Sequence, residues 1–142
     1  CTIGQKVFFY NLVSNPYCAP CSSAHHTIEN IMATRNDFNF QLVFLTKDEA
    51  VDDPGSIVAR HLLSIGREGI HDVKKATASW YSNGNYEKLI SDYPVKEYID
   101  GEILNRHNKY CRNADIHYTP TILINGRIVP EEYSPEDIKY LV

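Results

Sequence analysis

The sequence predicts an α/β domain in which a mixed sheet is interrupted by a long helical insertion. Three observations predict this fold class. A strand, helix, strand pattern opens the chain, helical periods fill its middle, and a short strand with a tight hairpin follows. We expect one domain over residues 1–142, with the insertion at about 52–112, because this length supports a single core.

The amino-terminal part has the pattern of a βαβ unit. Lys6–Val13 is a nearly continuous run of β-branched and aromatic residues, which is typical of a strand covered on both faces. From Cys21 to Met32, apolar residues recur three or four positions apart and predict a helix. Phe38–Leu45 predicts a second strand with two apolar faces. One face carries Phe38, Phe40, Leu42 and Phe44, and the other carries Val43 and Leu45.

Helical periodicity dominates the middle of the chain. Asp53 and Pro54 are typical of a helix start, and the apolar period after them ends before Gly66. A second period runs from Ile70 and ends near Gly84. Further helices are expected at 86–92 and at 94–110, although Gly101 weakens the last one.

Strand character returns at Thr121–Ile124. Asn125–Gly126 is a strong signal for a two-residue hairpin turn, because both residue types tolerate positive φ, and residues 127–129 then pair back. Ser134 can cap a final helix that ends at Leu141. The predicted sheet is therefore mixed and ends in a hairpin.

Composition and charge exclude several classes of protein. With 43% apolar and 23% charged residues, the chain has enough apolar surface to offset the entropy cost of folding. The 14 Lys and Arg against 18 Asp and Glu give a net charge of −4, without a basic block, so we expect no nucleic-acid partner. No apolar stretch approaches the roughly 18 to 20 residues that a membrane-spanning helix needs.

The start of the chain is unusual. The first residue is Cys1 and the only methionine is Met32, so we expect that the chain was processed or cut from something longer. An export signal or membrane anchor would then lie upstream.

The motif Cys18-Ala19-Pro20-Cys21 lies at the predicted junction between a strand and a helix. The amino end of a helix presents unpaired N–H groups and a positive dipole end, which favour a thiolate at Cys18. A thiolate can attack a disulfide and form a mixed disulfide, which Cys21 can then resolve. Ala19 and Pro20 support the motif, since the preset φ of proline suits the start of a helix. The spacing therefore predicts thiol–disulfide exchange.

Other uses of the cysteine pair stay open. A C-x-x-C motif also occurs in zinc sites, but no second pair in this sequence has ligand spacing, so we expect no metal and no cofactor. A purely structural disulfide would close a loop too small to add much stability. A third alternative is a non-catalytic peptide-binding module. The residues considered as further zinc ligands are His25, His26, Cys111 and His117.

Two motifs near opposite ends of the chain resemble the thioredoxin superfamily: the cysteine pair opening a helix, and Tyr118–Thr121 leading into a strand and hairpin. The resemblance implies a thioredoxin-like mixed sheet in which Pro120 is cis and faces the cysteine pair. It also implies that Thr119 and Pro120 position the substrate. The helical insertion before this cis-proline strand resembles the Dsb-type bacterial oxidoreductases.

More narrowly, Asn15–Cys21, Thr119–Gly126 and Pro130–Tyr133 resemble thioredoxin-like domains fused to bacterial membrane homologues of vitamin K epoxide reductase. This resemblance implies a protein disulfide oxidoreductase in the bacterial periplasm, within or associated with a membrane protein. It implies protein thiols and disulfides as substrates, and a quinone-linked membrane redox partner. Dsb oxidases usually carry a histidine between the cysteines, so Ala19-Pro20 leaves the direction of electron flow open. We expect a monomer.

Several other residues allow more than one interpretation. His25 and His26 are expected to be solvated helix residues, although a protonated imidazole there could stabilise a thiolate. Cys111 is expected to be a buried structural thiol, with a third redox cysteine as the alternative. Cys1 is a cut end, a lipid-modified residue or half of a bridge to Cys111. Trp80 and the tyrosines are expected mostly to pack the insertion.

Overall fold

The computed structural model describes residues 8–47, 52–130 and 133. None of the helices in these ranges is both long and apolar enough to cross a membrane. The elements are, in chain order, β1 (Phe8–Ser14), α1 (Ala19–Thr34), β2 (Phe38–Phe44), α2 (Pro54–Glu68), α3 (Val73–Asn83), α4 (Tyr86–Asp92), α5 (Gly101–Asn113), β3 (Thr121–Ile124) and β4 (Arg127–Ile128).

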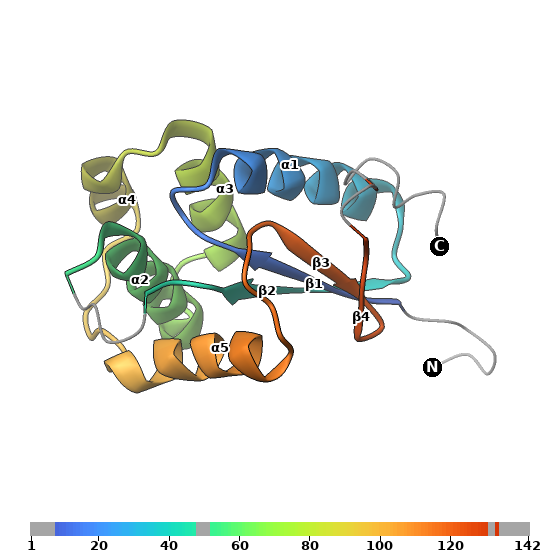
Figure 1. Cartoon of the computed structure of the whole chain (residues 1–142). Coiled ribbons are helices and arrows are strands. Elements are labelled where there is room, and N and C mark those ends of the chain that lie inside the picture. Colours follow the sequence, from blue (N-terminus) through green and yellow to red (C-terminus); the bar gives the residue numbers. More distant parts are fainter. Residues whose placement is uncertain (1–7, 48–51, 131–132, 134–142) are drawn as a thin grey trace.

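The described strands form a mixed sheet in the order β2-β1-β3-β4, as predicted. β1 pairs in parallel with β2 and antiparallel with β3, with Val13 opposite Val43 on one side and Thr121 on the other. α1 and α5 lie on opposite faces of this sheet, and α2, α3 and α4 stand beyond the carboxyl ends of β1 and β2 (Figure 1). Because β1 is central, its adjacent residues Leu12 and Val13, which point to opposite faces of the sheet, are both fully buried, which confirms the prediction of a strand covered on both faces.

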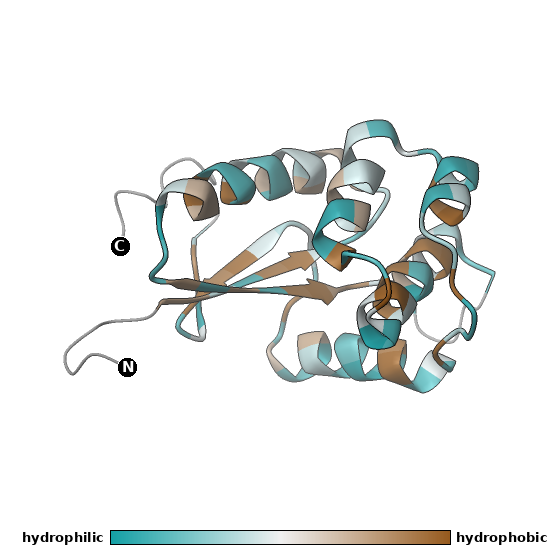
Figure 2. Cartoon of the chain, turned by 180° about the vertical axis from the view of Figure 1, so that it is seen from behind, coloured by the Kyte–Doolittle hydropathy of each residue, from teal (hydrophilic) through white to brown (hydrophobic). Residues whose placement is uncertain are grey.

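The two faces of β2 pack as the alternation predicted. Phe38 lies in an apolar cluster with Tyr10 and Ile28, on the α1 side of the sheet. Val43 and Leu45 pack against a different cluster, which contains residues of β1, α5 and β3. Figure 2 shows the strands as a strongly hydrophobic layer between more polar helices, as expected for a core that the helices cover.

α2 begins where predicted but ends later. The Asp53 carboxylate accepts a hydrogen bond from the Ser56 N–H, 3.2 Å away, and so caps the helix. The helix continues through Gly66 to Glu68, and Gly69, whose φ of 73° is left-handed, caps its end. A glycine inside a helix costs only about 1 kcal/mol, so Gly66 did not stop it.

α3 and α5 both begin later than predicted. α3 starts at Val73 rather than at Ile70, and α5 starts at Gly101 rather than at Pro94. In each case the preceding aspartate accepts hydrogen bonds from N–H groups of the first turn. The expectation that Gly101 weakens a helix interior was wrong, because this glycine is the first helical residue.

The segment 93–100 is not helical because α2 engages its backbone. His61 is buried, and its Nε2–H donates to the Tyr93 carbonyl, with the two atoms 2.7 Å apart. Arg60 donates to the Ile99 carbonyl at 3.0 Å. Side chains from α2 thus satisfy carbonyl groups that a continuous helix would have used internally.

The hairpin confirms the turn prediction, since Asn125 and Gly126 both have positive φ, at 51° and 81°. The Asn125 side chain also accepts a hydrogen bond from the Phe9 N–H, 2.8 Å away, which attaches the turn to β1. The helix predicted from Ser134 to Leu141 lies outside the described residues, as does the start of the first strand.

We predict that Leu62→Ala lowers the free energy of unfolding by about 2–5 kcal/mol. Leu62 is 1% exposed and belongs to the cluster that joins β2, α2 and α3, so its removal leaves a cavity. Leu63→Ala is the matched control, because Leu63 is only partly buried and should cost less. Chemical denaturation measures both, and equal losses would contradict this view of the core.

Candidate active site

Cys18 and Cys21 form a disulfide at the start of α1, with their Cα atoms 5.2 Å apart. Cys18 is the N-cap residue, and α1 continues through Ala19 and Pro20. The Cys21 N–H donates to Cys18 Sγ, with N and S 3.2 Å apart. The same N–H and the positive end of the helix dipole would stabilise a thiolate at Cys18 after reduction.

The two sulfur-bearing residues have different environments. Cys21 is fully buried, in the apolar cluster that includes Phe44 and Tyr81. Cys18 is partly exposed, and Ala19 and Pro20 beside it are exposed. A foreign sulfur atom can therefore approach Cys18 but not Cys21.

The structure places Thr119 beside Cys18, although 101 residues separate them. The Thr119 carbonyl oxygen lies 3.7 Å from Cys18 Sγ, and the Thr119–Pro120 peptide bond is cis. The next residue, Thr121, is buried, and its hydroxyl donates to the Tyr118 carbonyl at 2.5 Å. Thr119 and Pro120 remain partly exposed, so the segment before β3 offers backbone groups next to the disulfide.

Residues of α3 hold the loop that precedes Cys18. Trp80 Nε1 donates to the Pro16 carbonyl at 2.8 Å, and the Trp80 ring meets Tyr17 edge to face at 5.3 Å. The Tyr81 hydroxyl hydrogen-bonds the Ser14 hydroxyl, and burial raises the pKa of Tyr81 to about 12. The sequence predicts mostly packing for these aromatic residues, because no local pattern shows that α3 reaches this loop.

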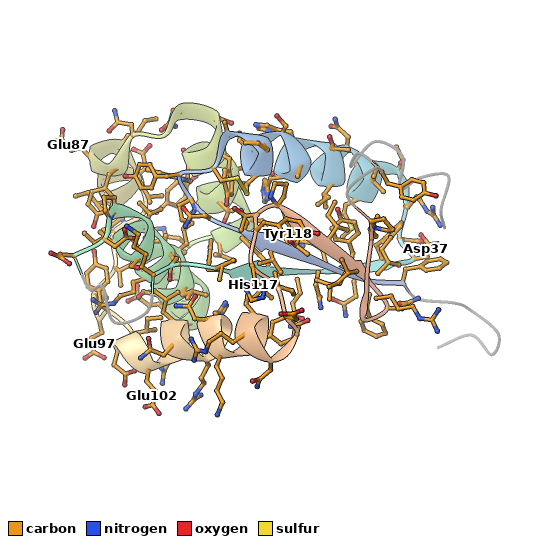
Figure 3. The ribbon with its side chains drawn as sticks, in the orientation of Figure 1. Asp37, Glu87, Glu97, Glu102, His117 and Tyr118 are labelled. Atoms are coloured by element: carbon orange, nitrogen blue, oxygen red, sulfur yellow. A yellow bond between two sulfur atoms is a disulfide. The ribbon has the colours of Figure 1, made fainter. Side chains whose placement is uncertain are left out.

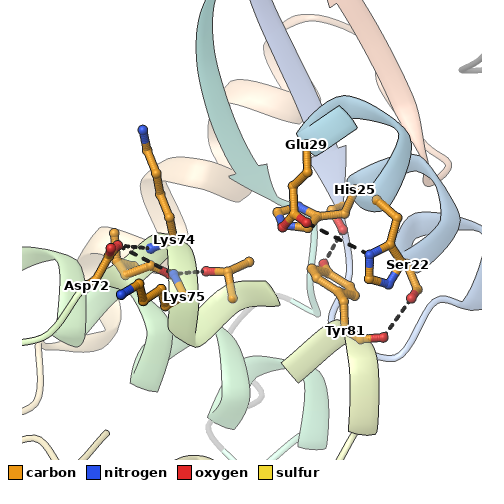
Figure 4. A network of polar contacts seen from close by, with 11 residues as sticks. Ser22, His25, Glu29, Asp72, Lys74, Lys75 and Tyr81 are labelled. Atoms are coloured by element: carbon orange, nitrogen blue, oxygen red, sulfur yellow. Dashed lines mark hydrogen bonds and ion pairs between the residues drawn. The ribbon is translucent and has the colours of Figure 1, made fainter. Parts of the chain in front are cut away.

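His25 is buried, so the expectation of a solvated residue was wrong. Its side chain stacks on Tyr81, with ring centroids 5.0 Å apart, and its Nε2 lies 2.9 Å from Glu29 Oε1 (Figure 4). Burial lowers the pKa of His25, against the opposing effect of Glu29. His26 is exposed, as predicted. The two histidines differ because only position 25 lies on the inner face of α1.

Cys111 is buried, as predicted, and forms no disulfide with another described residue. It packs with Val13, Ile116 and Leu123 in a cluster separate from that of Cys21. Cys1, the possible disulfide partner of Cys111, lies outside the described residues. Burial raises the pKa of the Cys111 thiol, so a thiolate is disfavoured there.

The residues considered as zinc ligands do not come together. His117 is exposed in the segment between α5 and β3, where Figure 3 labels it next to Tyr118. Its Nε2 lies 2.6 Å from Asp115 Oδ1. Within 8–47, 52–130 and 133, no three or more histidine, cysteine, aspartate or glutamate side chains form a group that could hold a metal ion.

Comparisons with known proteins place this geometry among known folds. No family model and no curated protein matches the sequence. A periplasmic thioredoxin-like protein from Salmonella enterica serovar Typhimurium superposes with a TM-score of 0.80 at 13% identity, over 100% of this chain and 86% of that one. For oxidised BdbD from Bacillus subtilis the TM-score is 0.74 at 13% identity, over 94% and 84%.

The oxidoreductase DsbA from Xylella fastidiosa also matches, with a TM-score of 0.69 at 16% identity over 99% of this chain and 87% of that chain. All three matches span 94% or more of this chain, so they include the helical segment between β2 and β3. The chain therefore has the thioredoxin-like α/β fold of the Dsb-type oxidoreductases.

Proposed function

We propose that this protein is a thiol–disulfide oxidoreductase that exchanges disulfides with protein substrates through Cys18 and Cys21. One observation carries the proposal: a disulfide at a helix N-terminus has one approachable sulfur atom, and the Thr119 carbonyl lies 3.7 Å from it. The fold supports it, since solved proteins with the same fold are described as oxidoreductases.

The reaction divides into two exchanges. In the reduced protein the Cys18 thiolate attacks a substrate disulfide, forms a mixed disulfide and releases one substrate sulfur as a thiolate. The Cys21 thiolate then attacks Cys18 Sγ, closes the internal disulfide and releases the second substrate thiolate. The substrate gains two electrons, and the reverse sequence oxidises a substrate dithiol. Ala19 and Pro20 keep the two sulfur atoms within bonding reach.

We assign substrate positioning to Thr119 and Pro120. An extended peptide whose cysteine reaches Cys18 passes the Thr119 backbone, whose carbonyl can accept a peptide N–H. Tyr17 and Tyr118 are exposed and belong to the segments that carry Cys18 and Thr119. These aromatic side chains supply apolar contact area that does not depend on a particular substrate sequence.

We propose that the protein acts outside the cytoplasm, as a monomeric single domain of the bacterial periplasm. One solved protein of this fold is described as periplasmic, and disulfides persist mainly in oxidising compartments. Because each turnover changes the redox state of the pair, a second protein must restore it. We propose that a quinone-linked membrane redox protein does so, and that this domain is part of that membrane protein or associated with it.

We predict that Cys18→Ala abolishes exchange and that Cys21→Ala accumulates mixed disulfides with substrate proteins. Removing Cys18 removes the attacking sulfur, whereas removing Cys21 removes only the resolving one. Insulin reduction measures the first effect, and non-reducing electrophoresis detects the trapped complexes. Cys111→Ala is the control, since Cys111 is buried in another cluster, and it should retain full activity.

Activity in the Cys18→Ala protein would overturn the assignment. An inert cysteine pair in the unaltered protein would favour the peptide-binding module instead. Zinc retained in a native mass spectrum would favour the metal-binding alternative. Loss of activity in Cys111→Ala with normal folding would make that residue a third redox cysteine.

The reduced protein should show selective alkylation. We predict that iodoacetamide at neutral pH modifies Cys18 rapidly and leaves Cys111 unmodified until the protein unfolds. Cys111 is fully buried and burial raises the pKa of its thiol, whereas Cys18 is partly exposed at a helix N-terminus. Peptide mass spectrometry after timed quenching identifies the modified residue. Equal rates at both cysteines would contradict these environments.

A further inference from the structure

Three residues of α1 lead from the buried sulfur to the surface. Cys21, His25 and Glu29 are spaced four positions apart, so they lie on one face of the helix and adjacent side chains are neighbours. Cys21 is 0% exposed, His25 is 5% exposed, and the Glu29 side chain is 43% exposed. The resolving thiol, which no solvent reaches, thus lies one turn from a titratable side chain.

The hydrogen bonds of His25 define which nitrogen carries its proton. Nε2 lies 2.9 Å from a Glu29 oxygen, and a carboxylate only accepts, so the neutral ring holds its proton on Nε2. Nδ1 is then a lone-pair acceptor, and it is buried without a hydrogen-bond partner in the protein. In the disulfide form Cys21 Sγ carries no hydrogen and cannot donate to it.

We propose that His25 is the general base for Cys21 and that Glu29 is its positioning residue. This inference rests on the proposed function. In the mixed disulfide between Cys18 and the substrate, the Cys21 S–H proton passes to His25 Nδ1, which leaves a Cys21 thiolate and an imidazolium paired with Glu29. The thiolate attacks Cys18 Sγ, the bond from Cys18 to the substrate sulfur breaks, and the substrate leaves as a thiolate. The imidazolium then releases its proton to solvent.

The surroundings of His25 suit this role. His25 and Glu29 line a cavity of about 480 Å³ between α1, β2, α2 and α3, which gives the proton a route to solvent. Besides Glu29, the groups that act on His25 are His26 on α1 and Tyr81 on α3, while Lys74 of α3 and Arg67 of α2 line the same cavity. Burial lowers the pKa of His25 and raises that of Tyr81, so at neutral pH the imidazole is unprotonated and the phenol uncharged.

The test separates the two exchanges in a single experiment. The reduced full chain is mixed with dithiobis(nitrobenzoate), whose coloured thiolate is released once when Cys18 attacks and again when Cys21 resolves. In H25Q we expect the second release at pH 7 to slow by about 100-fold, the scale of general-base catalysis, while the first release is unchanged. The second rate in H25Q should also rise with pH, whereas the wild-type rate varies much less.

H71Q is the control, because it makes the same substitution at a histidine outside α1 that packs against Tyr93, and it should leave both releases unchanged. E29Q should slow only the second release, and its exposed position makes it the variant that decides if H25Q does not fold. A second release with the wild-type rate and pH profile in H25Q, or in E29Q, would overturn the inference. If the wild-type protein shows no first release, the proposed function itself fails.

Discussion

The antiparallel pairing of β1 with β3 is the constraint on which the site depends. Val13 lies opposite Thr121, at the end of the sheet where β1 leaves and β3 enters. The chain after β1 carries Cys18 and the chain before β3 carries Thr119, so this register brings together segments 101 residues apart. A shift of one residue in this pairing would move the side chains of β3 to the opposite faces of the sheet, so the packing that fixes the register also aligns the site.

The helical segment between β2 and β3 contributes to the site as well as to the core. Its helix α3 holds the loop before Cys18 through Trp80, and it covers one side of His25 with Tyr81. Together with β2 and α2 it encloses Cys21. Cys21 is therefore buried while Cys18 stays partly exposed, a difference that the short motif could not produce without these packed helices.

Much of this architecture could be predicted from the sequence. The strands follow from runs and alternation of apolar residues, and Asp53 with Pro54 marks the start of α2 correctly, because capping depends on adjacent residues. The starts of α3 and α5 could not be placed, since apolar periodicity continues past the capping aspartates. His25 was misplaced because a polar residue type suggested solvent, whereas contacts with Glu29 and Tyr81 make its burial tolerable.

The amino-acid sequence by itself determined the reactive motif, the turns and most helix caps, because these depend on residue type and on neighbours a few positions away. Only the tertiary structure decided that Cys21 is enclosed while Cys18 is approachable, and that Thr119 lies beside the motif. It alone shows that the imidazole of His25 faces inward. The burial of Cys21 and the access of a substrate to Cys18 depend on side chains from distant segments, and local sequence patterns do not show which segments come into contact.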